Sequence, residues 1–526
     1  MKITIDQIPI EVKEGASVLD AASSLGIVIP TMCYLQGHTN HPSCMVCLVK
    51  DEEKGMFFPS CAMPVSEGMK ITTSSADVLE ARKEALELLL SDHVGDCEAP
   101  CRRSCPAFMD IPLMNRLIAA GDFEAALQVV REEIALPFVL GYICPAPCEK
   151  ACYRSPLGGA VSICMLKRFT AIGEGGESGE VGKGILTGKK IAVIGTGPAG
   201  LSAAFYLQRY GHQCILFDKN DLPGGTLRYD IPDDHLPKEI LDKEIEIIKR
   251  MGALFQMNTT VTKELFENSI IPGFDAIILA TGKRDLQPLE DFGFESGNDS
   301  WIKDKRSFST YRPGIYVCGN IIHDQRMAVR SAAQGKTAAM AIAAYFSGRD
   351  FNDGKFSFHS VITHLSDSER DEYLKESVPG SRIDPERGFL AGFTKEEAIR
   401  EAQRCLHCDC RKPATCKLRI YSEIYHANRR RFAGSERKHL TKLVQHDTVI
   451  FEPEKCIKCG LCVEISRREE KTLGLTFIGR GFDVRIGVPF TETINQGLDK
   501  TAELCVDACP TGALASKKQE ERYCYD

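Results

Sequence analysis

Cysteine is the residue type of this sequence that most clearly points to chemistry. The chain has 23 cysteines in 526 residues, and all but three (Cys214, Cys318 and Cys524) stand in short groups. Thiolates bind soft metals, and disulfides do not persist in a reducing compartment. We find no secretory signal and no run of about 18 apolar residues. We therefore expect a cytoplasmic protein whose grouped thiols hold metal.

The first cysteine group has the spacing C-x10-C-x2-C-x13-C and consists of Cys33, Cys44, Cys47 and Cys61. Only one pair of these cysteines is close in sequence, whereas a zinc site usually has two close pairs. This spacing favours an iron–sulfur cluster, and zinc is the alternative. The group resembles the N-terminal [2Fe–2S] domain of the complex I large iron–sulfur subunit and of iron-only hydrogenases. That resemblance implies a β-grasp fold. A hairpin expected over residues 2–12 and a short helix over 17–26, with a Ser17/Asp20 capping box, fit it.

The second group lies in HVGDCEAPCRRSC (93–105) and in residues 144–164. It resembles the N-terminal domain of the glutamate synthase small subunit and of dihydropyrimidine dehydrogenase, in which two [4Fe–4S] clusters interleave. The resemblance implies one cluster on Cys97, Cys101 and Cys152 and another on Cys105, Cys144 and Cys148. We assign His93 as the fourth ligand of the first. For the second we assign Cys164, three residues before Lys167, where the family has Gln or Glu. A solvated His93 and unliganded core cysteines are the alternatives.

Two further groups lie near the C-terminus. Cys405, Cys408, Cys410 and Cys416 stand within twelve residues and predict one [4Fe–4S] site, with zinc as the alternative. Cys456, Cys459, Cys462 and Cys509, the last followed by proline, match the bacterial ferredoxin pattern. A second ferredoxin cluster lacks ligands, which leaves Cys505 spare. The prediction is one [2Fe–2S] and about four [4Fe–4S] clusters.

A glycine-rich turn follows the apolar strand KKIAVI and precedes a helix. It comprises Gly195, Gly197, Pro198, Ala199 and Gly200. The three glycines permit a tight turn, close approach of a pyrophosphate and close helix–strand packing. The next strand ends at Asp218 and Lys219, where an acid can bind ribose hydroxyls. The turn predicts a dinucleotide site.

Three further matches favour FAD over a bare NAD site. LPGGTLRYDIP (222–232) resembles the flavin-contacting loop of the glutamate synthase small subunit, and AIILATG and PGIYVCGN resemble its later FAD motifs. Asn320 replaces the usual aspartate of the last motif. The resemblance adds these residues to the FAD site: Gly225, Thr226, Leu227, Arg228, Ala280, Thr281, Gly282, Gly319 and Asn320.

The family's second Rossmann unit, which binds NAD(P)H, has no room in this sequence. In the family it lies between the two later FAD motifs and needs over a hundred residues. Here only about 30 residues separate Gly282 from Gly314, the length of a single βαβ unit. We predict that the NAD(P)H domain is absent.

These motifs predict a multidomain α+β and α/β chain, with interdomain sequence that includes a glycine-rich linker at 173–184. The five expected parts are a β-grasp [2Fe–2S] domain (1–78), a helical domain with two [4Fe–4S] clusters (79–185), a Rossmann-like FAD domain (186–350), a linker and helical segment with the CxxCxC group (351–445), and a ferredoxin-like [4Fe–4S] domain (446–526). Residues 349–394 are polar and lack strong periodicity.

Composition narrows the function. Hydrophobic residues make up 43% and charged residues 26%, with a net charge of −7. This balance is typical of globular proteins and argues against a nucleic-acid role. The basic run HANRRRFAGSERKH (426–439) is expected to be a solvated face, with docking of an acidic partner as the alternative.

A flavin exchanges single or paired electrons, whereas clusters carry one. We therefore expect an electron-transfer subunit in a hetero-oligomer from an anaerobic metabolism. Its partners would be hydrogenase-, formate dehydrogenase- or NADH-dehydrogenase-like subunits, or a ferredoxin. The alternatives are an NAD(P)H-dependent oxidoreductase of the glutamate synthase small-subunit type and a scaffold with a structural flavin.

Overall fold

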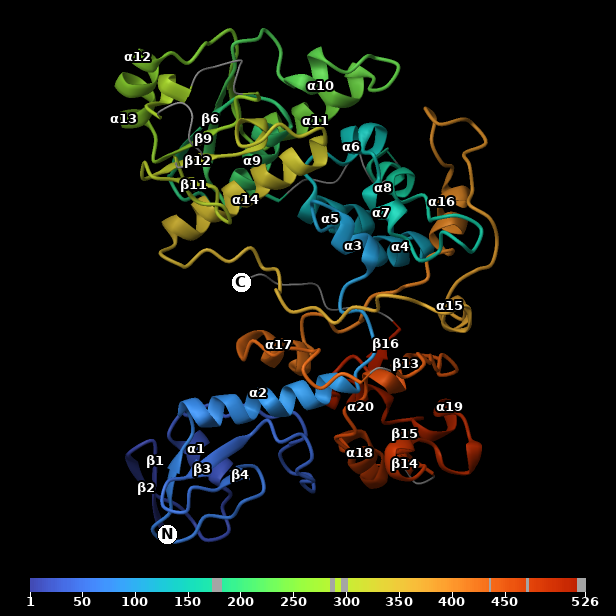
Figure 1. The fold of residues 1–526 in the computed structure, drawn as a ribbon. Helices are drawn as coiled ribbons and strands as arrows, with labels where there is room; N and C mark the ends of the chain where they lie inside the picture. Colours follow the sequence, from blue (N-terminus) through green and yellow to red (C-terminus); the bar gives the residue numbers. More distant parts are fainter. Residues whose placement is uncertain (173–181, 284–288, 295–300, 435–436, 470–472, 518–526) are drawn as a thin grey trace. The chain divides into compact units, whose positions relative to one another are not determined.

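The computed structural model describes residues 1–172, 182–283, 289–294, 301–434, 437–469 and 473–517. The chain divides into two compact units, each assembled from separated segments (Figure 1). Unit 1 comprises Met1–Ala99, Phe356–Glu376 and His407–Asp526, and unit 2 comprises Pro100–Lys355 and Ser377–Leu406. The five-part division stays a prediction, and most of the expected glycine-rich linker lies outside the described residues.

Unit 1 begins with a five-stranded mixed sheet in the order β2-β1-β5-β3-β4. The predicted hairpin forms, because Asp6 and Gln7 both adopt the positive φ that a two-residue turn requires. The predicted capping box of Ser17 and Asp20 also forms and begins helix α1. The elements are β1 (Lys2–Ile5), β2 (Ile8–Glu11), α1 (Val18–Ser24), β3 (Leu48–Asp51), β4 (Phe57–Pro59) and β5 (Lys70–Thr72).

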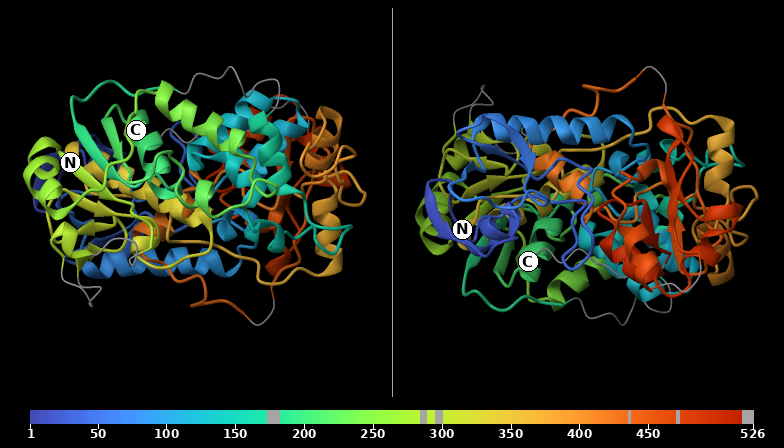
Figure 2. Two further views of the ribbon diagram at one scale, coloured as in Figure 1. Left: turned by 90° about the horizontal axis from the view of Figure 1, so that it is seen from above. Right: turned by 90° about the horizontal axis from the view of Figure 1, so that it is seen from below.

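The rest of unit 1 is mainly helical. The sixteen-residue helix α2 (Ala76–Ser91) packs against α17 (Lys417–Ile424). In the right-hand view of Figure 2, α2 is the long blue helix. The other elements are α15 (Asp367–Leu374), β13 (Val449–Phe451), α18 (Leu461–Glu469), β14 (Thr476–Ile478), β15 (Arg485–Gly487), α19 (Ile494–Gly497), α20 (Ala502–Ala508) and β16 (Leu514–Ser516).

Unit 2 contains a group of short helices. The amphipathic sequence 114–134 forms two helices rather than one, because Asp122 caps the second by accepting from the Ala125 N–H at 3.0 Å. Helix α16 (Lys395–Ala402), from the expected linker segment, packs on α4 and α8. The helices are α3 (Pro100–Ser104), α4 (Ile111–Ala119), α5 (Phe123–Glu133), α6 (Pro137–Ile143), α7 (Pro147–Lys150) and α8 (Ile163–Ile172).

Unit 2 also holds a seven-stranded sheet in the order β10-β11-β12-β9-β6-β7-β8. The strands β12, β9, β6, β7 and β8 are parallel, and the chain order reverses between β6 and β9. Ligands of such sheets bind at the carboxyl ends of the strands beside this switch point. The parallel strands are β6 (Lys190–Ile194), β7 (Gln213–Phe217), β8 (Leu254–Gln256), β9 (Ala276–Leu279) and β12 (Ile315–Val317).

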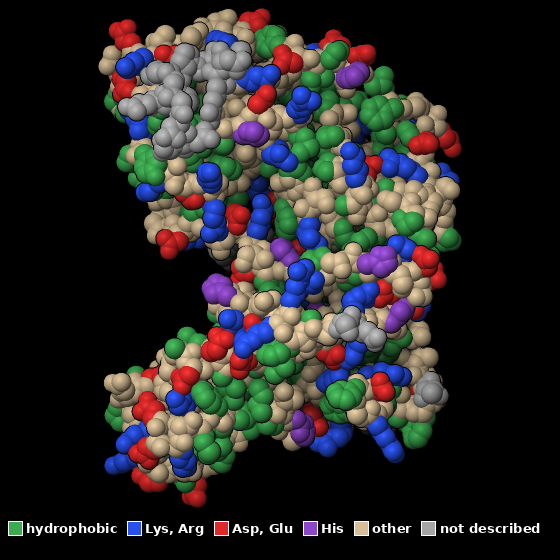
Figure 3. Space-filling view, in the orientation of Figure 1, with side chains coloured by type: hydrophobic (Ala, Val, Ile, Leu, Met, Phe, Trp, Pro, Cys, Tyr) green, Lys and Arg blue, Asp and Glu red, His purple; other side chains and the backbone are tan. Residues whose placement is uncertain are grey.

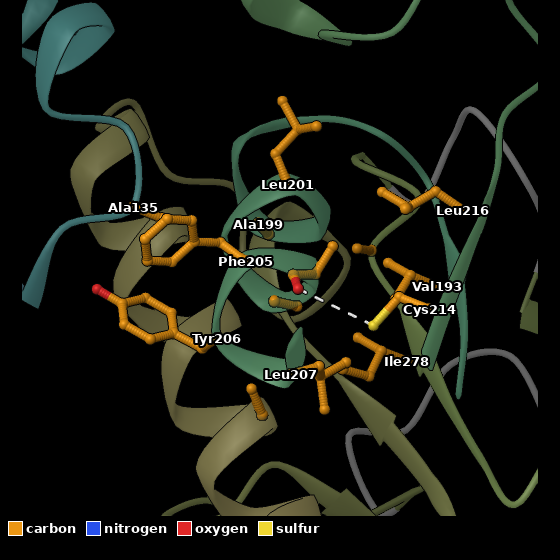
Figure 4. Packing of buried hydrophobic residues seen from close by; sticks show 14 of the residues in the cluster. Ala135, Val193, Ala199, Leu201, Phe205, Tyr206, Leu207, Cys214, Leu216 and Ile278 are labelled. Atoms are coloured by element: carbon orange, nitrogen blue, oxygen red, sulfur yellow. Dashed lines mark hydrogen bonds between the residues drawn. The ribbon is translucent and has the colours of Figure 1, made fainter. Parts of the chain in front are cut away.

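Helix α9 (Pro198–Arg209) contributes many side chains to the hydrophobic core on one face of this sheet. It packs side by side with α14 (Ala328–Phe346) against the sheet (Figures 1 and 2). Figure 4 shows Phe205 and Tyr206 of α9 directed away from the strands, while Val193 and Cys214 lie on the strand side. The remaining helices are α10 (Thr226–Tyr229), α11 (Lys238–Arg250), and the short α12 (Lys263–Leu265) and α13 (Ile271–Gly273), which a π-helical turn (Phe266–Ile270) joins.

The segment between Gly282 and Gly314 contains no second βαβ unit in its described residues. It contributes a 3-10 turn (Leu289–Phe292) and the strands β10 (Ile302–Asp304) and β11 (Ser309–Thr310), which pair antiparallel with each other. β11 then pairs with β12, at the edge of the same sheet. A short antiparallel extension therefore stands where the family has its NAD(P)H domain.

Candidate functional site: a nucleotide pocket and clustered thiols

A pocket of about 640 Å³ opens at the switch point of the parallel sheet. The glycine-rich turn lies between β6 and α9, Gly197 is the N-cap of the helix, and the first residues of α9 line the pocket. The predicted residues that line it are Gly195, Gly197, Pro198, Ala199, Asp218, Lys219, Gly225, Thr226, Leu227, Ala280, Thr281, Gly282, Gly319 and Asn320.

Two predicted residues do not line this pocket. Gly200 permits close packing instead, because a Cβ there would lie 1.9 Å from the Gly195 carbonyl oxygen. Arg228 donates to the Pro223 carbonyl at 2.6 Å and pairs with Asp242 on α11. Gly200 therefore supports the glycine-rich turn, and Arg228 supports the loop at 222–232, without contributing to the pocket wall.

Asp218 has a second task besides the expected one. Its Oδ2 accepts from the N–H and the hydroxyl of Thr196, at 2.8 and 2.6 Å. Its Oδ1 accepts from the backbone N–H and the side-chain amide of Asn220, at 3.0 and 2.9 Å. A carboxylate has about four acceptor positions, so all of them are occupied here, and a ribose hydroxyl would have to displace one of these donors. Asp218 thus also braces the glycine-rich turn, and its ribose contact stays a prediction.

Sequence reasoning missed several residues that line the pocket or support it from α14. Gln334 of α14 accepts from the Gly319 N–H at 2.8 Å and fixes the last motif. Gly335 lets α14 approach α9, since a Cβ there would lie 2.1 Å from the Ala199 carbonyl oxygen. The glycine within the alanine-rich helix was the available signal. Other lining residues include Asn220, Tyr229, Thr259, Lys283, Asp324 and Arg326.

The pocket fits a polar ligand. The hydroxyl of Thr281 is buried, has no hydrogen-bond partner and belongs to a pocket-lining residue. Buried polar groups are normally satisfied. Nothing lies within 4 Å of a Cβ built on Gly197, so this part of the turn leaves space for a phosphate. Both observations fit a bound dinucleotide.

The four N-terminal thiols come together in unit 1. The sulfur atoms of Cys47 and Cys61 lie 3.3 Å apart. Hydrogen bonds from the thiols of Cys44 and Cys61 lower the pKa of Cys33. All four are buried, and their donor set fits a [2Fe–2S] cluster.

A second set of four thiols converges in unit 2. Cys164 accepts a hydrogen bond from Cys144 and donates one to Cys148. Cys105 is close enough to interact electrostatically with Cys144. These are the four thiols expected to share the second [4Fe–4S] cluster, and their role as its ligands stays a prediction.

Lys167 is buried beside this set, and its Nζ donates to the Leu140 carbonyl at 3.1 Å. Burial alone would lower the pKa of Lys167, but the four surrounding thiols raise it. A buried cation therefore stands beside this thiol set.

The ferredoxin-like set converges in unit 1. Burial, followed by the neighbouring thiol of Cys509, raises the pKa of Cys456 to about 12. The same two effects raise the pKa of Cys459, and burial with these three thiols raises that of Cys462. Cys505 lies next to the set, with its sulfur 3.7 Å from the Cys462 carbonyl oxygen.

The remaining thiols have neighbours that the predicted pairing did not include, and that pairing stays a prediction. Cys97 belongs to unit 1, whereas Cys101 and Cys152 belong to unit 2. Burial, followed by the thiols of Cys410 and Cys97, raises the pKa of Cys416 to about 12. Cys97 therefore lies with two cysteines that are more than 300 residues away in the sequence, which the local spacing did not indicate.

Cys405 also has neighbours that its sequence spacing did not indicate. It is buried in a core cluster of unit 2, against which Cys101 and Cys152 pack, while Cys408 and Cys410 belong to unit 1. The boundary between the two units thus falls within the CxxCxC group, between Leu406 and His407. The single site expected for this group stays a prediction.

His93 is half-buried in unit 1 beside Lys455, and its Nδ1 atom is buried. Burial, reinforced by that ammonium group, lowers the pKa of His93 to about 4. The imidazole is thus neutral near pH 7, and its Nδ1 has no hydrogen-bond partner. The expected pairing with Cys101 and Cys152 would cross from unit 1 to unit 2.

No three His, Cys, Asp or Glu side chains converge closely enough for a single metal ion within the described ranges.

The basic run at 426–439 is largely paired within unit 1. Arg431 contacts Glu80, Glu84 and Glu87 along α2, with nitrogen–oxygen distances of 3.1, 2.6 and 2.9 Å. Arg437 pairs with Glu369. On the face drawn in Figure 3, basic and acidic side chains are interspersed. These pairs favour a role of the basic run in holding unit 1 together, rather than in docking an acidic partner.

Among the helices that the structure describes, none combines the length and apolar character needed to cross a bilayer.

Comparison with known proteins matches three families. Residues 1–76 match a 2Fe-2S iron-sulfur cluster binding domain, and residues 78–174 match the 4Fe-4S domain II of dihydropyrimidine dehydrogenase. Residues 193–258 match an NAD(P)-binding Rossmann-like domain.

Three relatives share about two fifths of the chain. The NADP(+)-dependent formate dehydrogenase subunit beta of Moorella thermoacetica is 36% identical over 39% of this chain and 32% of its own length. The NADPH-Fe(3+) oxidoreductase subunit beta of Geobacter sulfurreducens is 33% identical over 39% of this chain and 31% of its own. The glutamate synthase [NADPH] small chain of Bacillus subtilis is 34% identical over 39% and 42%. The chain spans less than half of each relative.

The chain is thus similar, over residues 1–76, 78–174 and 193–258, to a 2Fe-2S cluster-binding domain, a 4Fe-4S domain and a Rossmann-like nucleotide-binding domain, and over about two fifths of its length to subunits of NADP(H)-dependent oxidoreductases.

Proposed function

We propose that this chain is an electron-transfer subunit that binds FAD at the switch-point pocket and holds one [2Fe–2S] and about four [4Fe–4S] clusters. It would operate in the cytoplasm with other redox subunits, such as hydrogenase- or formate dehydrogenase-like chains. The mixed five-stranded sheet around the first thiol set supports the β-grasp assignment. The short module that carries the last set supports the ferredoxin assignment.

The observation that carries this proposal is one group of buried, mostly apolar side chains in unit 1. It contains Cys33 and Cys44 of the first set, Cys416, and Cys459 of the ferredoxin-like set. Three thiol sets with different sequence origins therefore share one apolar environment. Apolar packing around cluster ligands limits water access, which is one of the determinants of reduction potential. A series of neighbouring sites suits transfer of electrons between them.

The chain's residues would hold the flavin in a defined way. The pyrophosphate would bind at the start of α9, where the N–H groups that follow Pro198 have no helical partner, and the unpaired hydroxyl of Thr281 offers a polar group along the pocket. The flavin, when bound, would exchange electron pairs or single electrons, and the clusters single ones. Nothing in the described residues after Gly282 builds a second dinucleotide lobe, which favours a partner subunit as electron donor or acceptor.

The test is anaerobic purification with metal and flavin analysis. The expected result is bound FAD, high iron and EPR signals from both cluster types after dithionite reduction. Zinc with little iron would refute the proposal, as would the absence of flavin from protein purified with FAD.

A second candidate is direct oxidation of NADPH or NADH by this chain. It is favoured by the relatives, whose names specify NADP(+) or NADPH, and by the NAD(P)-binding description of the family at 193–258. Stopped-flow measurement separates the two candidates. Rapid bleaching of the flavin by NADPH or NADH supports the second, and an unchanged flavin spectrum supports the first.

A further inference from the structure

We propose that Cys405 and Cys97 each ligate the cluster to which the sequence spacing assigned the other, an arrangement that we call the exchange. Cys405 would ligate a [4Fe–4S] cluster together with Cys101 and Cys152, and Cys97 would ligate another with Cys410 and Cys416. This inference rests on the proposed function, since it concerns how the clusters are held.

The position of Cys97 is fixed by unit 1. Its N–H donates to the Ser360 carbonyl at 3.0 Å, and its sulfur accepts from the Ser360 N–H at 3.3 Å. The Cys410 N–H in turn donates to the Cys97 carbonyl at 3.3 Å. These bonds place the Cys97 and Cys410 backbones side by side.

An adjacent buried ion pair holds the same segment. Glu98 lies 2.7 Å from Arg419, and their side chains are only 3% and 1% exposed. Arg419 belongs to α17, which begins directly after Cys416. Breaking a buried pair leaves an uncompensated charge, so this contact keeps Cys97 beside the start of α17.

The position of Cys405 is fixed in the same way by unit 2. Arg404 donates to the carbonyls of Gly158 and Gly159 at 2.9 and 2.8 Å. Glu401 accepts from the Ser162 N–H at 2.8 Å. The end of α16 is thus fastened to the loop that follows Cys152.

The thiols themselves share this environment. The guanidinium of Arg154 interacts electrostatically with both Cys152 and Cys405. Cys101 on α3 and Cys152 pack against the core cluster that contains Cys405. A thiol from the C-terminal part of the chain therefore stands at the set for which the sequence had assigned Cys97.

The exchange has a consequence for folding. Each of the two clusters would join segments about 250 to 320 residues apart in sequence. Loading either cluster would therefore fix residues 377–406 to the helical part of unit 2, or residues 407–419 to the segment that precedes α3.

Counting clusters in paired variants tests the proposal. We would purify the full chain labelled with ⁵⁷Fe and measure by Mössbauer spectroscopy how many [4Fe–4S] centres are altered. Cys152→Ala, Cys405→Ala and Cys410→Ala should each alter one centre. The pair C152A/C405A should again alter one, and C405A/C410A should alter two.

The opposite pattern would overturn the exchange. If C405A/C410A alters one centre and C152A/C405A alters two, the CxxCxC group forms one site, as its spacing suggested. Cys318→Ala removes a buried thiol outside all groups and should alter none. Where an alanine variant fails to retain FAD, the matching serine variant, which conserves volume, is read instead. Wild-type protein with zinc in place of iron would refute the proposed function rather than the pairing.

Discussion

The glycine-rich turn offers the sharpest test of the nucleotide site, because Gly197 and Gly200 differ in what a methyl group would meet. A Cβ on Gly197 meets nothing within 4 Å, whereas one on Gly200 would lie 1.9 Å from the Gly195 carbonyl oxygen. Close carbon–oxygen contacts in proteins are about 3.3 Å, so Gly200→Ala requires a shift of about 1.4 Å between α9 and the turn.

The two alanine variants should therefore fail differently. Overpacking costs about 1–3 kcal/mol, and each 1.4 kcal/mol is a factor of ten. Gly200→Ala should lower the melting temperature of FAD-free protein and weaken FAD binding about 5- to 150-fold. Gly197→Ala should leave that melting temperature unchanged and still weaken FAD binding at least about tenfold, because the methyl group enters the space left for the pyrophosphate.

The assay is titration of FAD-free protein by flavin fluorescence, with thermal unfolding of the same samples. Gly273→Ala is the matched control, since Gly273 is exposed, lies outside the pocket and also has nothing within 4 Å of a built Cβ. Wild-type FAD affinity in Gly197→Ala would refute the pyrophosphate placement. An unperturbed Gly200→Ala would refute the packing argument.

Three further predictions concern buried ionisable groups. Lys167→Met should lower the reduction potential of one [4Fe–4S] centre by on the order of 100 mV in EPR-monitored titration, because one charge within about 6 Å contributes about 3 kcal/mol at an effective dielectric constant of 20; an unshifted potential contradicts the placement of the cation. His93→Ala should alter one [4Fe–4S] centre, as its neutral imidazole has an unpartnered Nδ1; a full set of centres would show that it is not a ligand. Glu244 accepts from the Phe138 and Val139 N–H groups at 2.8 and 3.1 Å, and burial raises its pKa to about 8. The folded state then binds an extra proton between about pH 4.5 and 8, so stability falls as pH rises through this window, by at most about 2–3 kcal/mol from pH 6 to 8. Thermal unfolding of Glu244→Gln should show a smaller decline over that range, and parallel pH profiles for both proteins would count against the raised pKa.

Local sequence was sufficient to predict elements whose partners are adjacent or follow one topological rule. The Asp6–Gln7 turn and the Ser17/Asp20 cap involve near neighbours in sequence. The three nucleotide motifs converge although they are far apart in sequence, because each follows a strand of one parallel sheet and the carboxyl ends of those strands share one edge. The ferredoxin-like thiols of Cys456, Cys459 and Cys462 come together because they are only three residues apart in sequence.

The tertiary structure alone decided which distant thiols meet. The spacing of Cys405, Cys408 and Cys410 suggested one site, yet Arg404 fastens Cys405 to Gly158 and Gly159 in unit 2. Glu98 and Arg419 likewise hold Cys97 beside Cys416 in unit 1. Spacing constrains only thiols within a few residues of each other. The position of a segment hundreds of residues away depends on buried hydrogen bonds and ion pairs, which no local pattern records.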